Sequence, residues 1–411
     1  MKNSRMAVMT VVGALLIGAL GACSASDNGS STSSGDSSAS GDGNEKVTIS
    51  VAGLLPTADD SAKKQLADAV TSFEAKNPNI TVNTVDYEWK AQTFTTELAG
   101  GTLPNVFEIP LTDGRTLIEN GQLADIDSLV RALPYGGDFN AELLENGQDA
   151  SGKIYAVPAK SVYAVALHYN RNLFKEAGLN PDKPPTTWDE VRADAKAIHD
   201  KTGKAGYATM AVDNSGGWIL AAAANSRGGT IESFDGKKYT ATLNDPTVKQ
   251  SLEWIKALKW DDGSLLDRTD LGWADINQEF AAGNIGMYVS GSDVYNSLVE
   301  SNGVNADWGY GMTAIPTENG GGALTGGTMA AVTKGSTDAQ KDAAVKWIDW
   351  WYLSKLQDKD QAIADAKTRS GANPPQAVGT PVLPIFSEKL YKENQEWIKD
   401  YINVPLNDMT G

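Results

Sequence analysis

The stretch VTISVAGLLPTADDSAKKQLADAVTSFEAKNPNITVNTVD (47–86) decides the fold class. Val47, Ile49 and Val51 alternate with polar residues, which is the period of a half-buried strand. A helix should follow, because four apolar residues recur at the spacing of one helical face, namely Leu66, Ala69, Val70 and Phe73. A second apolar run at 80–85 predicts another strand. The stretch therefore indicates two strands joined by a crossover helix, the unit from which parallel sheets are built.

The same alternation of strands and helices continues along the chain. NVFEIP (105–110) predicts a third strand, Thr187 opens a helix with a capping box, and the segment 244–246 opens another with a proline. Apolar residues in the segment 344–351 recur at the spacing of one helical face, which predicts a further helix. Single cores stop growing near about 250–300 residues, so a chain of 411 residues should hold two. We expect two α/β lobes joined by short crossings, with ligands outside the carboxyl ends of the strands.

Composition and charge argue against several classes of function. The formal net charge of −17 argues against nucleic acids and anionic membrane surfaces as partners, since no basic patch can be assembled. The two histidines, His168 and His199, are too few for the usual zinc or iron sites, so we expect no metal site and no cofactor. None of the common nucleophile, zinc-protease or phosphate-loop motifs occurs. We therefore expect no catalytic residues, and we expect His168, in a predicted strand, to be a packed or surface histidine rather than a base.

The first 45 residues have the features of an exported lipoprotein. Two basic residues precede an apolar run (7–20) that is too short to span a membrane comfortably, as in a secretory signal peptide. Leu20-Gly21-Ala22-Cys23 resembles a bacterial lipobox, whose cysteine receives a diacylglyceryl group. We predict a signal peptide over 1–22, and a lipidated Cys23 with a disordered Ser/Gly tether over 23–45. An ordinary signal peptide with a chance cysteine is the alternative.

A longer segment carries a family resemblance. GKIYAVPAKSVYAVALHYNRNLFKEAGLNPDKPPTTWDEV (152–191) closely resembles the signature of family 1 extracellular solute-binding proteins, the lipoprotein receptors of ABC importers for carbohydrates. The three parts of that pattern are here Gly152–Pro158, Tyr169–Leu179 and Pro185–Glu190. Three further stretches agree in order, namely GTLPNVFEI (101–109), EFAAGNIGMYVSGSDVY (279–295) and AIPTENGGGALTGGTMAAVTKGS (314–336). Asn105 stands where the family usually has an aspartate.

The resemblance implies a maltose-binding-protein-like, periplasmic-binding-protein-like fold. It has two α/β lobes, a central ligand cleft and three hinge crossings. By resemblance, the crossings fall near Ala159, near Pro316 and between about 352 and 370. The lobes are then expected to comprise 46–159 plus 316–355 for the N-lobe and 160–315 plus 356–411 for the C-lobe. The family usually continues with further C-terminal helices, so we expect a shorter C-terminal region here.

Candidate ligand-binding residues combine aromatic side chains with polar ones, because sugars present apolar CH faces and rows of hydroxyls. Trp89 and Asp113 each follow a predicted strand, and Trp218 is flanked by two glycines that should leave its indole accessible. Where the family's cleft aromatic normally projects, this sequence has Ser290, Asp293 and Tyr295. The last cleft segment of the family corresponds to TRSGANPP (368–375), which offers Arg369 and Asn373 as donors.

The function that the resemblance implies is capture of a carbohydrate, in particular an oligosaccharide, by lobe closure and its delivery to an ABC importer. The expected partners are the permease subunits of the importer and the membrane, through the lipid at Cys23. We expect a monomer at the extracellular face of the cell membrane. Two alternatives stay open. One is a binder of another solute, such as a polyamine, on the same fold, and the other is a secreted carbohydrate-active enzyme with a pair of carboxylates.

Overall fold

The computed structural model describes residues 46–54, 60–212, 214–235, 238–268, 270–406 and 409–410. The predicted signal peptide, Cys23 and the predicted tether lie outside the described residues. Residues 46–411 form one compact unit. Within the described ranges, no helix combines the length and the apolar character that crossing a membrane requires.

The N-terminal part of the sheet has the predicted strand–helix–strand order. β1 (Val47–Leu54) and β2 (Ile80–Asp86) pair in parallel, and α1 (Asp60–Lys76) lies between them in the chain. β3 (Val106–Pro110) pairs in parallel with β1 on its other side. β10 (Thr325–Val332), from much later in the chain, pairs antiparallel with β3. The alternation of strands and helices in the sequence therefore predicted this region correctly.

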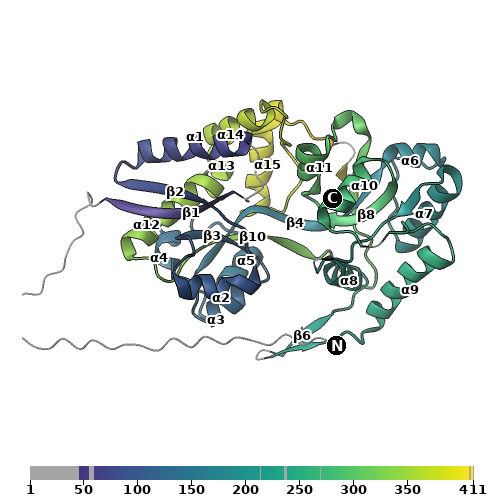
Figure 1. The fold of residues 1–411 in the computed structure, drawn as a ribbon, viewed down its shortest axis with the longest axis horizontal. Coiled ribbons are helices and arrows are strands. Elements are labelled where there is room, and N and C mark those ends of the chain that lie inside the picture. Colours follow the sequence, from purple (N-terminus) through teal and green to yellow (C-terminus); the bar gives the residue numbers. More distant parts are fainter. Residues whose placement is uncertain are drawn as a thin grey trace, which may run out of the picture. The chain divides into compact units, whose positions relative to one another are not determined.

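One long strand, β4 (Ala156–Asn170), belongs to both lobes (Figure 1). Its first part pairs with β10, and its second part pairs with β8 (Ile285–Gly291) and β9 (Tyr310–Ala314). The register with β10 shifts next to Ala159, where Lys160 has a φ of 60°. A positive φ is rare outside glycine and produces a local bulge here. The bulge lies where the resemblance places a crossing between the lobes.

The remaining elements complete the two lobes and a C-terminal region. Two short strands extend the second lobe, with β5 (Ala205–Tyr207) on β8 and β11 (Met409–Thr410) on β9. The helices of the first lobe are α2 (Ala91–Gly100), α3 (Gly114–Glu119), α4 (Asp127–Arg131), α5 (Ala141–Leu144), η1 (Glu145–Gly147) and α12 (Asp338–Ile348). The second lobe has α6 (Arg171–Glu176), α7 (Trp188–Thr202), α8 (Ser215–Ser226), the hairpin β6 (Glu232–Phe234) and β7 (Tyr239–Ala241), α9 (Pro246–Trp260), α10 (Trp273–Ala281), α11 (Val294–Asn302) and η2 (Ala306–Trp308). The C-terminal region has η3 (Asp349–Leu353), α13 (Ser354–Gln357), α14 (Lys359–Ser370), α15 (Glu388–Ile398) and η4 (Lys399–Tyr401).

Two predicted helix starts are confirmed in atomic detail. The Thr187 hydroxyl accepts a hydrogen bond from the Glu190 backbone N–H at 3.2 Å, and the Glu190 carboxylate accepts one from the Thr187 N–H at 3.1 Å. This reciprocal pair is the capping box that begins α7. At the start of α9, Asp245 accepts from the Thr247 N–H at 2.8 Å, and Pro246 occupies the first turn.

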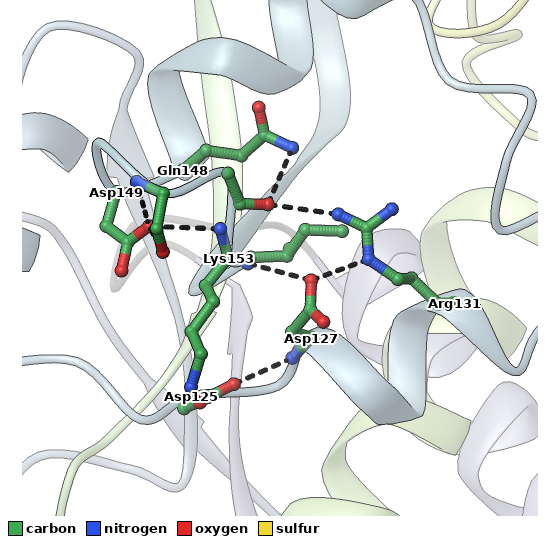
Figure 2. Close-up of polar contacts among 9 residues, drawn as sticks. Asp125, Asp127, Arg131, Gln148, Asp149 and Lys153 are labelled. Atoms are coloured by element: carbon green, nitrogen blue, oxygen red, sulfur yellow. Dashed lines mark hydrogen bonds and ion pairs between the residues drawn. The ribbon is translucent and has the colours of Figure 1, made fainter.

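A polar cluster on the first lobe holds the turn that leads into β4 (Figure 2). Asp127 accepts hydrogen bonds from Arg131 Nε at 2.7 Å and from the backbone N–H of Ile154 at 3.2 Å. Arg131 also donates from Nη2 to the carbonyl oxygen of Gly152 at 2.9 Å. Gly152 has a φ of 84°, so this turn favours the glycine with which the family pattern begins. These residues of the pattern therefore have a structural role.

Buried side chains form separate cores in the two lobes. Ile49, Phe73 and Trp347 belong to the largest cluster, which lies around β1, β3 and β10. Two further clusters lie around the second part of β4 and around β8. The C-terminal region contributes to both lobes, since Phe386 packs in the first core and Val404 in one of the others. Assignment of 356–411 to the second lobe therefore describes only part of this packing, and the lobe boundaries stay a prediction.

Candidate functional site

A cavity of about 880 Å³ lies between side chains of the two lobes. The carboxyl end of β1 (Ala52–Leu54) and Glu108 of β3 line it from the first lobe. From the second lobe, the cavity is lined by Asp293, which immediately precedes α11, and by Asn296 in the first turn of that helix. Lys160, at the bulge of β4, also lines the cavity and lies in the sequence between the residues of the first lobe and those of the second. This is the position expected for a ligand of an open α/β sheet, which binds where strands end.

A carboxylate with two partners lies in the wall of this cavity. Glu108 Oε2 accepts from Lys160 Nζ at 3.0 Å, and Glu108 Oε1 accepts from the Tyr352 hydroxyl at 2.8 Å. Tyr352 is 3% exposed, and its burial, together with the nearby Glu108 charge, raises its pKa well above the ordinary value. Tyr352 therefore stays a neutral donor. The Lys160 ammonium has three N–H donors, so it can bond Glu108 and a ligand hydroxyl at the same time.

An indole forms an aromatic part of the wall. Trp351 is half-buried, and its ring stacks on that of buried Trp347 with centroids 5.8 Å apart and an interplanar angle of 14°. Tyr352 contacts the same ring edge-on at 6.4 Å. Stacking on a buried ring fixes the orientation of Trp351 while part of its surface contributes to the cavity. Such an aromatic platform suits the apolar face of a sugar ring.

The charged groups in the cavity wall include both signs. Lys160 pairs with Glu108, and Lys355 pairs with Asp365 at 3.4 Å. Arg369 donates from Nη2 to the carbonyl oxygen of Ala377 at 2.6 Å. Two further carboxylates, Asp293 and Glu300, also line the cavity. Each of these three cations therefore has an acceptor oxygen within the protein.

The structure brings two of the eight predicted ligand-binding residues together in this cavity, Asp293 and Arg369. Asp293 also acts on a neighbouring side chain. Burial, together with the Asp293 charge, raises the pKa of Tyr163 to about 12. Asn373 is exposed and precedes the cis-proline Pro374, which lines the cavity.

The other five predicted residues do not line the cavity. Trp89 packs on Phe94 with ring centroids 4.8 Å apart, and burial raises the pKa of Asp113 at the start of α3. Ser290 and Tyr295 are both buried in the second lobe, at 3% and 1% exposed. A role of these five residues in ligand binding stays a prediction.

The environment of Trp218 differs from the expectation drawn from its glycine neighbours. Its ring meets that of Trp273 edge-to-face at 5.1 Å, and it packs against a core cluster of the second lobe. The indole is therefore only partly accessible, because Trp273 and the core cluster cover part of it. The partner is 55 residues away in the sequence, and local composition carries no sign of it.

Sequence reasoning missed Glu108, Lys160, Trp351 and Tyr352. The sequence does contain a signal for Glu108, because it is the one charged residue within the predicted strand NVFEIP. A charged side chain in a buried strand needs a polar partner. Trp351 was counted in the apolar stripe of a helix. The helix instead widens to a π-turn at Asp349–Leu353, a feature common at functional sites.

Known proteins resemble most of this chain in sequence. A family model for bacterial extracellular solute-binding proteins matches residues 68–373. The chain belongs to this family. The diacetylchitobiose binding protein DasA of Streptomyces coelicolor is 29% identical over 277 residues, which cover 66% of this chain and 62% of DasA. The chain spans 66%, just under two thirds, of the length of three curated binding proteins from Brucella that it matches.

Solved structures of solute-binding proteins share the fold. An ABC transporter solute-binding protein from Thermotoga lettingae, bound with α-D-tagatose, superposes with a TM-score of 0.69 at 18% identity, over 86% of this chain and 84% of the other. UgpB from Mycobacterium tuberculosis, in complex with glycerophosphocholine, gives 0.66 at 19% identity, over 87% of both chains. These likenesses show a two-lobe α/β fold. The family and the fold are those of binding proteins rather than enzymes.

Proposed function

We propose that this protein captures a carbohydrate, in particular an oligosaccharide, between its lobes and delivers it to an ABC importer. The observation that carries the proposal is the cavity in which half-buried Trp351 lies beside the bonded group of Glu108, Lys160 and Tyr352. A sugar ring can stack its CH face on the indole. Its hydroxyls can donate to the carboxylate and accept from the ammonium, which are the stronger kinds of hydrogen bond.

The size of the cavity supports a ligand larger than one sugar ring. Small-molecule sites span about 300–1,000 Å³, and the cavity of about 880 Å³ is near the upper end. DasA, a sequence relative, is described as binding diacetylchitobiose, and the Thermotoga lettingae protein of similar fold is bound with α-D-tagatose; both support a carbohydrate ligand. Closure of the lobes about the bulge at Lys160 would bury such a ligand on both sides.

An organic cation such as a polyamine is the second candidate. Carboxylates are more numerous than cations in the cavity wall, and aromatic faces also attract cations. Salt separates the two ligand classes, because attraction between charges is screened and stacking of a neutral sugar is not. A carbohydrate-active enzyme is a third possibility, and release of reducing ends by the pure protein would reveal it.

A thermal-shift screen tests the proposal. Ligand at a hundred times its Kd should add about 2.7 kcal/mol to the free energy of unfolding, which is readily measured as a higher melting temperature. We expect one or more oligosaccharides to stabilise the protein equally at low and at high salt. Stabilisation by spermidine alone, lost at high salt, would contradict the proposal and favour the polyamine.

Attachment to the outer face of the cell membrane through Cys23 is a separate part of the proposal. It rests on the lipobox-like sequence alone. Metabolic labelling with a fatty acid should label the wild-type protein and leave Cys23→Ser unlabelled. Label on the Cys23→Ser protein would contradict the anchor while leaving the binding function untouched. The permease partner and the monomeric state likewise stay proposals, the first testable by co-purification and the second by light scattering.

A further inference from the structure

A second cavity, of about 170 Å³, lies inside the second lobe. It is bounded by α8 and α9, which pack against each other, and by the first residue of α7. Its lining shares no residue with the cavity between the lobes. Leu252, which is 55% exposed, is part of the lining, so the cavity reaches the surface of the molecule.

The wall of this second cavity is mostly apolar, with one charged residue and the hydroxyl residues Tyr207, Thr209 and Ser251. Ile219, Leu220 and Ile255 contribute aliphatic side chains, and Trp188 and Trp254 contribute indoles. The two indoles contact each other edge-on at 5.0 Å, and each uses its ring N–H inside the protein. The indoles are therefore held in place and offer only carbon surface to the cavity.

The charge belongs to Arg227, which follows the last residue of α8. Its side chain is buried, at 1% exposed, and its Cζ lies 4.3 Å from the centroid of the Trp188 ring. Nη1 donates to the carbonyl oxygen of Ala223 at 3.2 Å. Nε has no hydrogen-bond partner among the residues that the structure describes. The guanidinium has five N–H donors, and the bond from Nη1 to Ala223 uses one of them.

This buried cation lacks a close counter-ion. No ion pair within the described ranges joins Arg227 to a carboxylate, and Glu318 and Asp189 act on it only at longer range. Burial lowers the pKa of Arg227 from its ordinary value, yet a guanidinium keeps its charge in proteins. Cation–π contact with the indoles offsets part of the cost of burying the charge but supplies no acceptor.

We infer that this cavity binds a small aromatic carboxylate, with the carboxylate on the guanidinium of Arg227 and the ring between α8 and α9. A guanidinium donates charge-assisted hydrogen bonds to a carboxylate, and these are stronger than those between neutral groups. The volume fits one ring, since a dry apolar cavity of about 150 Å³ in another protein holds benzene. The site is distinct from the carbohydrate site and does not depend on it.

Benzoate and its neutral isostere benzamide are the probes that test this inference. In calorimetric titration of the full chain, we expect benzoate to bind more tightly than benzamide by a factor on the order of tenfold, because it gains charge-assisted hydrogen bonds. Arg227→Gln should remove this preference. Ala223→Leu, which fills the cavity from α8 and keeps the arginine, should abolish benzoate binding.

Two controls make the result decisive. Trp351→Ala, in the other cavity, should leave benzoate affinity unchanged, and thermal melts show whether each variant is folded. If Arg227→Gln fails to fold, the comparison of Ala223→Leu with wild type still decides. Equal binding of benzoate and benzamide, benzoate binding that survives Ala223→Leu, or no binding at millimolar benzoate would each overturn the inference.

Discussion

Replacement of Trp351 by alanine should separate ligand binding from folding. In the structure the indole is half-buried and stacks on Trp347. A tryptophan buries about 150–250 Å², so half-burial removes roughly 100 Å² from water, or about 2.5 kcal/mol at about 25 cal/mol per Å². Lost ring stacking adds about 1 kcal/mol. We therefore expect Trp351→Ala to lower the free energy of unfolding by about 3.5 kcal/mol.

The same substitution should weaken sugar binding independently of that loss. Removal of a stacking platform from a binding site costs about 1–3 kcal/mol, which is roughly ten- to a hundredfold in Kd. Calorimetric titration measures this loss of affinity. The ligand is the oligosaccharide that stabilises the protein most in the screen, and the temperature is one at which circular dichroism shows the variant to be fully folded. Trp351→Tyr keeps an aromatic face and should recover most of the affinity.

Trp260→Ala is the matched control, because Trp260 is 74% exposed at the end of α9 and does not line the interlobe cavity. We expect it to change neither the affinity nor the unfolding free energy appreciably. A folded Trp351→Ala protein that binds the sugar as tightly as wild type would refute the role of the indole. The predicted binding residues Trp89, Trp218 and Asp113 would then be the next to substitute.

Three further predictions concern stability. Gly206→Ala should destabilise the protein by about 1–3 kcal/mol in urea unfolding, because its new Cβ would overlap the backbone carbonyl oxygen of Ala195; a melt like that of wild type would contradict this. Gly217→Ala should instead stabilise α8 by about 0.5–1 kcal/mol, since its Cβ would meet open space; a lower urea midpoint would show that the helix needs the glycine. Burial, with the nearby Glu190 charge, raises the pKa of Asp194 to about 6. The folded state then binds the proton more tightly than the unfolded state, so stability falls as pH rises from about 4 to 6. Asp194→Asn should therefore gain about 1 kcal/mol at pH 7.5, allowing for its partial exposure, and nothing at pH 4; an equal gain at both pH values would exclude this linkage.

The sequence predicted the fold better than the site, for reasons that particular residues make clear. The alternation at Val47, Ile49 and Val51 and the capping box at Thr187 are local patterns, and the structure forms the expected elements there. The interlobe cavity is instead assembled from segments far apart in the chain. Glu108 meets Tyr352 across 244 residues, and no local pattern indicates that contact.

Only some of the residues predicted from the expected cleft segments line the cavity, again because distant segments assemble it. Asp293 and Arg369 line the cavity, whereas Ser290 and Tyr295, close to Asp293 in the sequence, are buried away from it. Which side of a strand or helix end faces a cavity depends on the packing of both lobes. That packing fixes Trp351 through Trp347 and the π-turn, which a regular helical period does not anticipate.

Small-angle X-ray scattering with and without ligand tests the central claim most directly, namely that a carbohydrate is captured between two lobes that close. The measurement requires the oligosaccharide at a concentration shown by calorimetry to saturate the protein. Closure about the crossing at Lys160 predicts a smaller radius of gyration in the bound state. An unchanged scattering profile at saturation would contradict capture by lobe closure.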